Sequence, residues 1–503
     1  MASTAGSPNA ETLRDVQGGL IGFNKDFQRL VFVNFADKAS GEYFVRLLRP
    51  FVVNGERVLE FNRLYKGITS DGLPGHDIQS IWINLWLSFP GLQMLDAPSL
   101  DAFPEDFKQG MAARASLIGD QGRSAPDRWQ SPFENGALPH AIVVIAADTN
   151  AGIGQGYADV AGILSASGAS ELLPPQDGHT RPLGFRGREQ FGFKDGISQP
   201  GIKGLTVSSK SKTDVVAAGE FLIGYPNEDG DVSGQPSPTP PPQPTPYNPT
   251  PPPPLQAQLP GWATNGTFVV YRRLQQDVGA FIKFKQERAG ALNLTPDTLG
   301  AKLLGRWPSG APMEHVPGEG KDIDPAQSDP SEHDQAVLND DHINNFNYDE
   351  DHDGTNVPRA AHVRKSNPRS IQLPDGDRSN RHRILRRGIP YGDDFVEGEP
   401  PYGEQPQPAQ DRGLLFVCFQ ASIARGFEFV QGRWANAPGF QEPGDGEDPI
   451  ISQDNDPRVF RLPRAGATAT ELSIAQWVFT MGGGYFFAPS LTGLRVLSVA
   501  AAG

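Results

Sequence analysis

One carboxylate is notable for the residues that surround it. Asp195 lies in the segment FGFKDGISQPG (191–201), between the apolar residues Phe193 and Ile197 and among several glycines. Apolar neighbours would remove water from the carboxylate and shift its pKa, and glycines allow other groups to approach the backbone closely. The segment therefore predicts either an acid/base site or a tight turn in which Asp195 bonds its own backbone.

A histidine further along the chain also lies beside residues that could serve a ligand. His362, in RAAHVRKSNPR (359–369), follows two alanines that would leave room for a large planar group, and it precedes basic residues that could bind anions. A structural role for this histidine explains the segment equally well. A second basic run, RHRILRRGIPYG (381–392), places Arg386 after an apolar pair, which is typical of a salt-bridged helix end or an anion site.

The acidic segment NYDEDHDGTNV (347–357) begins like a calcium-binding EF-hand loop. That loop requires a bidentate glutamate at its twelfth position, which is Ala360 when counted from Asp349, so calcium of this type is excluded. Oxygen-rich clusters also suit Mn²⁺. Asp349, Asp351 and Asp353 are therefore candidate Mn²⁺ ligands, with a solvated acidic loop as the alternative.

Composition and motifs exclude several functional classes. The chain has 503 residues and a net charge of −15 without a basic block, which argues against nucleic acid as a partner. The single cysteine, Cys418, excludes an intramolecular disulfide framework and a thiolate zinc cluster. The sequence contains no zinc-type histidine pair, phosphate-binding loop or serine-hydrolase elbow. No apolar run is long enough to span a bilayer, so no membrane partner is expected.

The elements that must position these residues are a mixture of strands and helices. Apolar runs bounded by turn residues predict strands at 18–24, 29–35, 140–147, 220–225, 266–273 and 413–420. Helices are predicted at 40–48, 295–307 and 423–434. In the second of them Thr295 would be the cap and Pro296 the first helical residue. This mixture predicts an α+β fold.

Two strand–helix pairs resemble each other near the two ends of the chain. LVFVNF and GEYFV (30–45) match LLFVCF and GFEFV (414–430), which indicates two related halves unless the match arose by chance. Between them, the proline-rich segment 236–254 cannot join a sheet interior and is expected to be extended and solvated. We therefore predict an N-terminal domain at 12–230, a surface insertion at 231–260 and a C-terminal domain at 261–500.

Six segments taken together resemble the dye-decolorizing peroxidases. GFKDG (192–196) fits the GxxDG signature of that family, and AAHVRKSNPR, ILRRGIPYG, EFLIGY, LLFVCFQ and GGGYFF occur in the family's order. The resemblance covers nearly the whole chain and is nearest to the larger fungal enzymes. It implies two ferredoxin-like modules that form a dimeric α/β-barrel-like pair, with one haem b bound mainly in the C-terminal module.

The resemblance also implies a role for individual residues at the haem. His362 would be the axial ligand of the iron, with Asp448 as the carboxylate partner of its imidazole. Asp195 corresponds to the family's distal acid, which moves a proton of the bound peroxide. Arg386 corresponds to the distal arginine, which contacts the cofactor side and stabilises negative charge as the O–O bond breaks.

Four further residues match positions that the family uses around the haem or at the surface. Leu414 and Phe416 stand where the family has apolar residues beside the distal face. Trp434 and Tyr391 match positions that some fungal members use as surface radical sites, through which bulky dyes deliver electrons to a buried haem. Plain packing is the alternative for both aromatic residues.

The function implied is that of a haem peroxidase. Such an enzyme uses H₂O₂ to oxidise dyes and phenolic or other aromatic compounds by one-electron steps through a ferryl intermediate, and Mn²⁺ is a further candidate substrate. The alternative is a haem-binding or haem-trafficking protein of the same fold with incidental peroxidase activity. The expected partners are H₂O₂ and small aromatic reductants.

Location and assembly are also expectations from the family. Members of this size are often secreted, so an extracellular location is favoured over a cytoplasmic one, although the sequence begins without an evident leader. The sequons at Asn265 and Asn293 matter only for a secreted chain. The chain is expected to be a monomer or a weak homo-oligomer.

Overall fold

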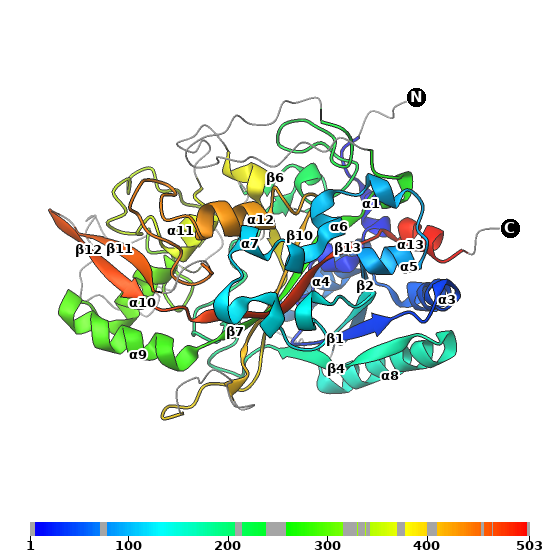
Figure 1. Ribbon diagram of the computed structural model, residues 1–503, viewed down its shortest axis with the longest axis horizontal. Coiled ribbons are helices and arrows are strands. Elements are labelled where there is room, and N and C mark those ends of the chain that lie inside the picture. Colours follow the sequence, from blue (N-terminus) through cyan, green and yellow to red (C-terminus); the bar gives the residue numbers. More distant parts are fainter. Residues whose placement is uncertain are drawn as a thin grey trace.

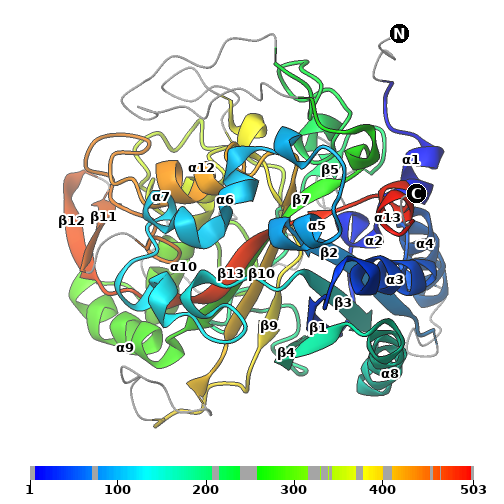
Figure 2. The same cartoon turned by 45° about the vertical axis from the view of Figure 1, so that its right-hand side comes forward.

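A single nine-stranded sheet organises the molecule (Figure 1). The computed structural model describes residues 6–70, 78–206, 214–237, 258–314, 329, 338, 343–369, 378–399, 410–453, 457–464 and 466–499. The strand order is β4-β1-β3-β2-β13-β7-β10-β8, and β9 pairs with β10 beside β8. Both views place α3 and α8 at one end of the sheet and α9 with the β11–β12 hairpin at the other (Figures 1 and 2).

The first half of the sheet is a complete β-α-β-β-α-β unit. Its elements are β1 (Phe27–Asn34), α3 (Lys38–Leu48), β2 (Ile81–Ser88), β3 (Ala141–Ala147), α8 (Asn150–Ser167) and β4 (Ser170–His179). The first strand, β1, pairs antiparallel with both β3 and β4, and β2 pairs with β3. This is the ferredoxin-like arrangement.

The second half repeats the same order with longer connections. Its elements are β7 (Thr267–Gln276), α9 (Val278–Ala289), α10 (Pro296–Leu304), α11 (His362–Ser366), β8 (Leu385–Arg386), β9 (Ile389–Tyr391), β10 (Gly413–Gln420), α12 (Phe427–Phe429), a π-helix (Val430–Ala435) and β13 (Val478–Ala488). Here the first strand, β7, lies between β13 and β10, and β8 and β9 pair with β10. Two ferredoxin-like modules are therefore joined through the pairing of β2 with β13.

Smaller elements surround the two modules. They are α1 (Ala10–Asp15), α2 (Gly18–Ile21), α4 (Gly55–Ser70), α5 (Phe89–Met94), α6 (Glu105–Ala113), α7 (Ala115–Ile118), β5 (Gly201–Ile202), β6 (Val215–Val216), β11 (Arg458–Arg464), β12 (Ala467–Ile474) and α13 (Leu491–Leu497). Among the described residues, no helix combines the length and the low polarity that crossing a bilayer requires.

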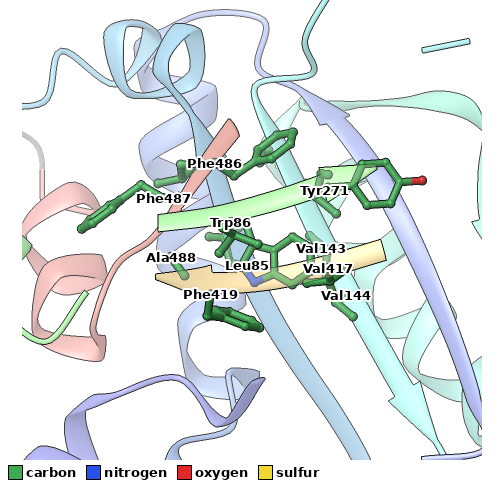
Figure 3. Packing of buried hydrophobic residues seen from close by; sticks show 14 of the residues in the cluster. Leu85, Trp86, Val143, Val144, Tyr271, Val417, Phe419, Phe486, Phe487 and Ala488 are labelled. Atoms are coloured by element: carbon green, nitrogen blue, oxygen red, sulfur yellow. The ribbon is translucent and has the colours of Figure 1, made fainter. Parts of the chain in front are cut away.

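The two modules share one hydrophobic core where their strands meet (Figure 3). Trp86 of β2 packs edge to face against Phe419 of β10, with ring centroids 5.9 Å apart. Phe486 and Phe487 of β13 are fully buried beside them. Because side chains of both modules contribute to one core, the modules should support each other's stability.

Most of the predicted elements that carry a strong periodic pattern are present. The strands predicted at 29–35, 140–147, 266–273 and 413–420 are β1, β3, β7 and β10, and the helix predicted at 40–48 is α3. Thr295 caps α10 as expected, because its hydroxyl oxygen accepts a hydrogen bond from the backbone N–H of Thr298 at 3.0 Å. The segment predicted as a helix at 423–434 instead holds the short α12 and the π-helix.

Two predicted strands are wrong. The segment 18–24 contains the helical turn α2, in which a Cβ on Gly18 would lie 2.6 Å from Val58, so glycine is required for close packing. The segment 220–225 follows a short 3₁₀ helix and is a buried turn. Both are short apolar runs, whose hydrophobicity reports burial without distinguishing a strand from a turn of helix.

The internal repeat is present, but the segments that suggested it are not equivalent. β1 is the first strand of its module and corresponds to β7, whereas β10 is a third strand and corresponds to β3. The matching segments 30–45 and 414–430 therefore occupy different positions in their two modules. The proline-rich segment falls mostly outside the described residues, and the predicted domain boundaries stay a prediction.

Candidate active site

One cavity collects most of the candidate residues. It holds about 1550 Å³ of atom-free space including its open mouth, and its wall is formed mainly by elements of the second module and by the loop before β5. The candidates that line it are Asp195, His362, Arg386, Leu414 and Phe416. Residues from four separate parts of the sequence thus share one space.

His362 is held by a carboxylate on the side of the ring away from the cavity. Its Nδ1 lies 2.9 Å from Oδ2 of Asp448, whose side chain is completely buried. The backbone N–H groups of Ile450 and Ile451 donate to the other oxygen of Asp448 at 2.8 and 3.0 Å. The carboxylate is thus fixed in place, and Nε2 remains the ring nitrogen available to a ligand in the cavity.

The electrostatics of this pair keep Asp448 ionised and make the imidazole of His362 more basic. Burial would lower the pKa of His362, but the adjacent charge of Asp448 and its hydrogen bond outweigh burial and raise it. For Asp448, burial would raise the pKa, but the charge of His362 and three hydrogen bonds lower it. Asp448 therefore stays ionised and withdraws the Nδ1 proton toward itself, which makes Nε2 a stronger electron donor.

The alanines before His362 pack against neighbouring elements and do not line the cavity. Ala360 and Ala361 are both fully buried. Ala360 lies in a cluster with Leu304 of α10, and Ala361 in a cluster with Ala301 of the same helix. The interpretation that they make room for a planar group is therefore wrong; they let α11 lie close against α10.

Asp195 and Arg386 form an ion pair in the wall of the cavity. Nη1 of Arg386 donates to Oδ1 of Asp195 at 2.7 Å, and the two side chains keep 27% and 30% of their surface exposed. The backbone N–H of Gly196 donates to the same oxygen at 2.6 Å, and Gly192 and Gly196 both have positive φ. The tight turn predicted for this segment is therefore confirmed, and Asp195 also faces the cavity, while its acid/base role stays a prediction.

This contact sets the protonation state of Asp195. Burial would raise the pKa of Asp195, but the charge of Arg386, the N–H of Gly196 and the hydrogen bond from Arg386 outweigh burial and lower it. Arg386 is itself placed by the sheet, since it lies on β8 opposite Cys418 and its N–H donates to Oε1 of Gln199 at 3.0 Å. The pair supplies an ionised carboxylate and a fixed guanidinium at one wall.

Leu414 and Phe416 lie on β10 two residues apart and therefore point to the same face of the sheet. Both line the cavity, whereas Leu415 between them is completely buried in the shared core. Their apolar side chains cover part of the wall near the polar pair. Such a wall limits the water that can reach a ligand there.

The sequence analysis did not identify several other residues of the cavity wall. Arg306, which follows α10, lies there with a buried guanidinium that donates to the carbonyl oxygens of Gly310 and Ile343 and contacts no carboxylate among the described residues. Burial lowers the pKa of Arg306 to about 9. A second histidine, His382, also lines the cavity, with Nδ1 2.7 Å from the carbonyl oxygen of Arg425. Arg306 lies in no recognisable motif, and His382 lies in the basic run 381–392 without a spacing that marks it, so only tertiary contacts reveal that the two line the cavity.

The three acidic candidates do not form an Mn²⁺ site. Asp349 and Asp353 are exposed, whereas Asp351 is buried and faces inward. Its carboxylate accepts the backbone N–H groups of Asn356 and Val357 at 3.0 and 2.8 Å and pairs with Arg364 at 3.0 Å. Across the described ranges, no three acidic, histidine or cysteine side chains converge for a metal. The Mn²⁺ cluster prediction is therefore wrong, because Asp351 closes its own loop.

This arrangement makes Asp351 a stability residue. Asp351→Asn removes one partner of a buried ion pair, so we expect the free energy of unfolding to fall by about 3 kcal/mol, measured by denaturant unfolding. Asp349→Asn and Asp353→Asn, which change exposed neighbours, are expected to alter stability by less than about 0.5 kcal/mol. Equal effects at the three positions would contradict the structural role of Asp351.

The two predicted surface aromatic residues are buried. Trp434 is 2% exposed and stacks on Phe440 with ring centroids 5.2 Å apart. Tyr391 is also 2% exposed and lies under the guanidinium of Arg273, 4.5 Å from its ring centroid. Their placement at the surface is therefore wrong. The family resemblance suggested surface positions for both residues, but the π-helix and β9 place them in the interior.

Comparisons with known proteins agree with this geometry. A family model described as the DyP dimeric alpha+beta barrel domain matches residues 15–182, and one described as Dyp-type peroxidase, C-terminal, matches residues 302–443. Peroxidase 2 of Mycetinis scorodonius is 31% identical over 98% of this chain and 89% of its own length.

Solved structures resemble the chain over almost its whole length. An ancestral D-type dye decolorizing peroxidase has a TM-score of 0.77 at 30% identity and covers 97% of this chain and 99% of its own. A dye-decolorizing peroxidase in complex with 2,6-dimethoxyphenol has a TM-score of 0.76 at 28% identity, with the same coverage. Two family models, a near full-length relative and a shared fold together establish that the chain belongs to the dye-decolorizing peroxidase family, which makes it an H₂O₂-dependent oxidoreductase.

Proposed function

We propose that the chain binds one haem b in this cavity through His362 and uses H₂O₂ to oxidise dyes and phenols. The observation that carries the proposal is the presence, in one cavity, of an imidazole backed by a buried carboxylate and of an Asp195–Arg386 ion pair. The imidazole with its carboxylate partner suits a metal ligand, and the ion pair suits peroxide activation. Bound haem would supply the redox chemistry, accepting two oxidising equivalents from H₂O₂ and passing them on singly.

The residues present fit a haem. Nε2 of His362 is available to iron, because Nδ1 is engaged by Asp448. The wall contains the apolar side chains Phe191, Phe416 and Ile450, which suit a porphyrin face. Arg306 offers a buried positive charge without a carboxylate partner among the described residues, which suits an anionic propionate. The cavity thus offers an imidazole for the iron, apolar side chains for the porphyrin face and a positive charge for a propionate.

Asp195 and Arg386 would divide the work on peroxide. Cleavage of H₂O₂ requires a proton to move from one of its oxygens to the other, and the oxygen that receives the proton leaves as water. Asp195, held ionised by Arg386, can take that proton and return it. The guanidinium of Arg386 stabilises the negative charge that develops as the O–O bond breaks.

The proposed reducing substrates are dyes and phenols. The family supports dyes, and a related enzyme crystallised with 2,6-dimethoxyphenol supports phenols. Mn²⁺ is left out of the proposal, because no described cluster of carboxylates could hold it. Haem carriage alone would need His362 but not the Asp195–Arg386 pair, so that pair favours an enzyme.

The proposal predicts an acidic pH optimum. An unperturbed carboxyl group titrates near pH ~3.9 and an unperturbed imidazole near ~6.5. Because the pKa of Asp195 is lowered, its base form is present throughout the range above ~3.9 and persists below it. Reduction of peroxide also consumes protons, so we expect dye oxidation to be fastest at acidic pH. A pH–rate profile with its optimum above neutrality, in a chain that retains Asp195, would count against this assignment.

Two measurements test the proposal as a whole. The chain purified with sufficient iron and haem precursor is expected to show a Soret absorption band and to bleach dyes only when H₂O₂ is present. A colourless protein would overturn the haem assignment. A coloured protein without peroxide-dependent bleaching would overturn the enzymatic one.

A further inference from the structure

The carboxylate of Glu189 lies inside the loop that carries Asp195. Oε2 accepts the backbone N–H of Phe191 and Oε1 accepts that of Phe193, both at 2.9 Å. The side-chain amide of Gln276, at the end of β7, donates to Oε2 at 2.6 Å. Glu189 is partly open and lines the same cavity. The side chain of Glu189 therefore connects two residues of its own loop to each other and connects the loop to β7.

Backbone contacts show that the loop folds around this carboxylate and ends at Asp195. The N–H of Glu189 donates to the carbonyl oxygen of Phe193 at 2.9 Å, and the N–H of Asp195 donates to that of Gly187 at 3.0 Å. Gly192, with φ of +95°, makes the turn between them. The position of Asp195 thus depends on a closed loop whose interior is filled by Glu189.

No described backbone group replaces Glu189 as the acceptor for these two N–H groups. Removing the carboxylate would leave the N–H groups of Phe191 and Phe193 without their acceptor beside an apolar wall, which is costly. The loop would then shift to recover the hydrogen bonds. Since Asp195 follows Phe193 by two residues, a shift there moves its carboxylate relative to Arg386.

We infer that Glu189 is the positioning residue that holds Asp195 in place to move the peroxide proton. The inference rests on the proposed function, because it assigns Glu189 a role only through Asp195. Both oxygens of Glu189 already accept hydrogen bonds from Phe191, Phe193 and Gln276, so we assign it no direct part in the proton transfer. Its contribution is geometric, and a displacement of about 1 Å at a reacting group can cost on the order of 100-fold in rate.

A double-mutant cycle on the haem-loaded protein tests the inference. Glu189→Gln keeps the shape of the side chain but replaces one acceptor oxygen by an NH₂ group, and we expect it to slow the stopped-flow reaction with H₂O₂ at least about 10-fold. Asp195→Asn is expected to be slower still. The double variant should be no slower than Asp195→Asn alone, because the two residues act as one unit.

A second readout is independent of haem and of activity. Hydrogen exchange in the peptide covering 189–196 is expected to accelerate in Glu189→Gln, with or without haem, while exchange in the β7 strand stays unchanged. Glu220→Gln is the matched control, since the carboxylate of Glu220 likewise accepts a backbone N–H, from Glu228 at 3.0 Å, but lies outside the cavity. That control is expected to leave the peroxide reaction unchanged.

The outcomes separate this inference from the proposed function. If Asp195→Asn is slow but Glu189→Gln reacts at the wild-type rate, the inference alone is overturned. The inference alone is also overturned if Glu189→Gln slows the Asp195→Asn variant by the same factor as it slows the wild type, because the two residues would then act independently. If Asp195→Asn reacts at the wild-type rate, the assignment of Asp195 fails, and the inference fails with it. Should Glu189→Gln not fold, Glu189→Asp, which shortens the reach, is read by the same criteria.

Discussion

Replacing Asp195 by asparagine is expected to slow the reaction with H₂O₂ at least about 100-fold, the usual contribution of a positioned acid–base group. Asparagine has nearly the same shape and can still accept the N–H of Gly196, so the loop should keep its conformation. It cannot take a proton at neutral or acidic pH. The haem should remain bound, since His362 is unchanged.

The measurement is a stopped-flow absorption experiment on the haem-loaded variant. The wild-type protein should show a rapid change of the Soret band after mixing with H₂O₂, and the variant a slow one with the same starting spectrum. Asp177→Asn is the control, because Asp177 pairs with Arg29 on the first module, away from the cavity. A variant as fast as the wild type would reassign the base.

Replacing His362 by alanine is expected to abolish haem binding. Its imidazole lines the cavity and is backed by the buried carboxylate of Asp448, the arrangement expected of a metal ligand. The variant should be purified without a Soret band under conditions in which the wild type is coloured. It should also be less stable, because Asp448 would remain buried without its partner.

The second histidine of the cavity provides a stringent control. His382 stacks on Phe429 with ring centroids 3.6 Å apart, and its Nδ1 contacts the carbonyl oxygen of Arg425. Because its Nδ1 is engaged by a backbone carbonyl oxygen and its ring is held in a stack, we expect His382→Gln to retain haem. Haem loss in His382→Gln together with retention in His362→Ala would invert the assignment of the ligand.

Residues in short motifs were placed correctly from the sequence because local composition fixes their surroundings. The glycines around Asp195 predict a tight turn, and the structure shows that turn, with Asp195 lining the cavity. Strong periodicity similarly identified β1, β3, β7 and β10. Asp448, which the family resemblance pairs with His362, lies against it, although the two are 86 residues apart in the sequence.

Features that depend on tertiary contacts could not be predicted in the same way. Trp434 follows a polar segment, yet the π-helix turns it into a cluster with Phe440. β13 contains Gly482, Gly483 and Gly484, which are atypical of strands, but their missing side chains allow close approach to neighbouring groups. Arg306 is a cavity residue only because α10 ends there. No local pattern encodes these contacts.

The most direct test of the central claim is a crystal structure of the haem-loaded protein with an anomalous map at the iron absorption edge. The proposal predicts one iron peak per chain within bonding distance of Nε2 of His362, with Asp195 and Arg386 on the opposite side of the porphyrin. An iron bound by another side chain, or the three residues on one side of the ring, would contradict it.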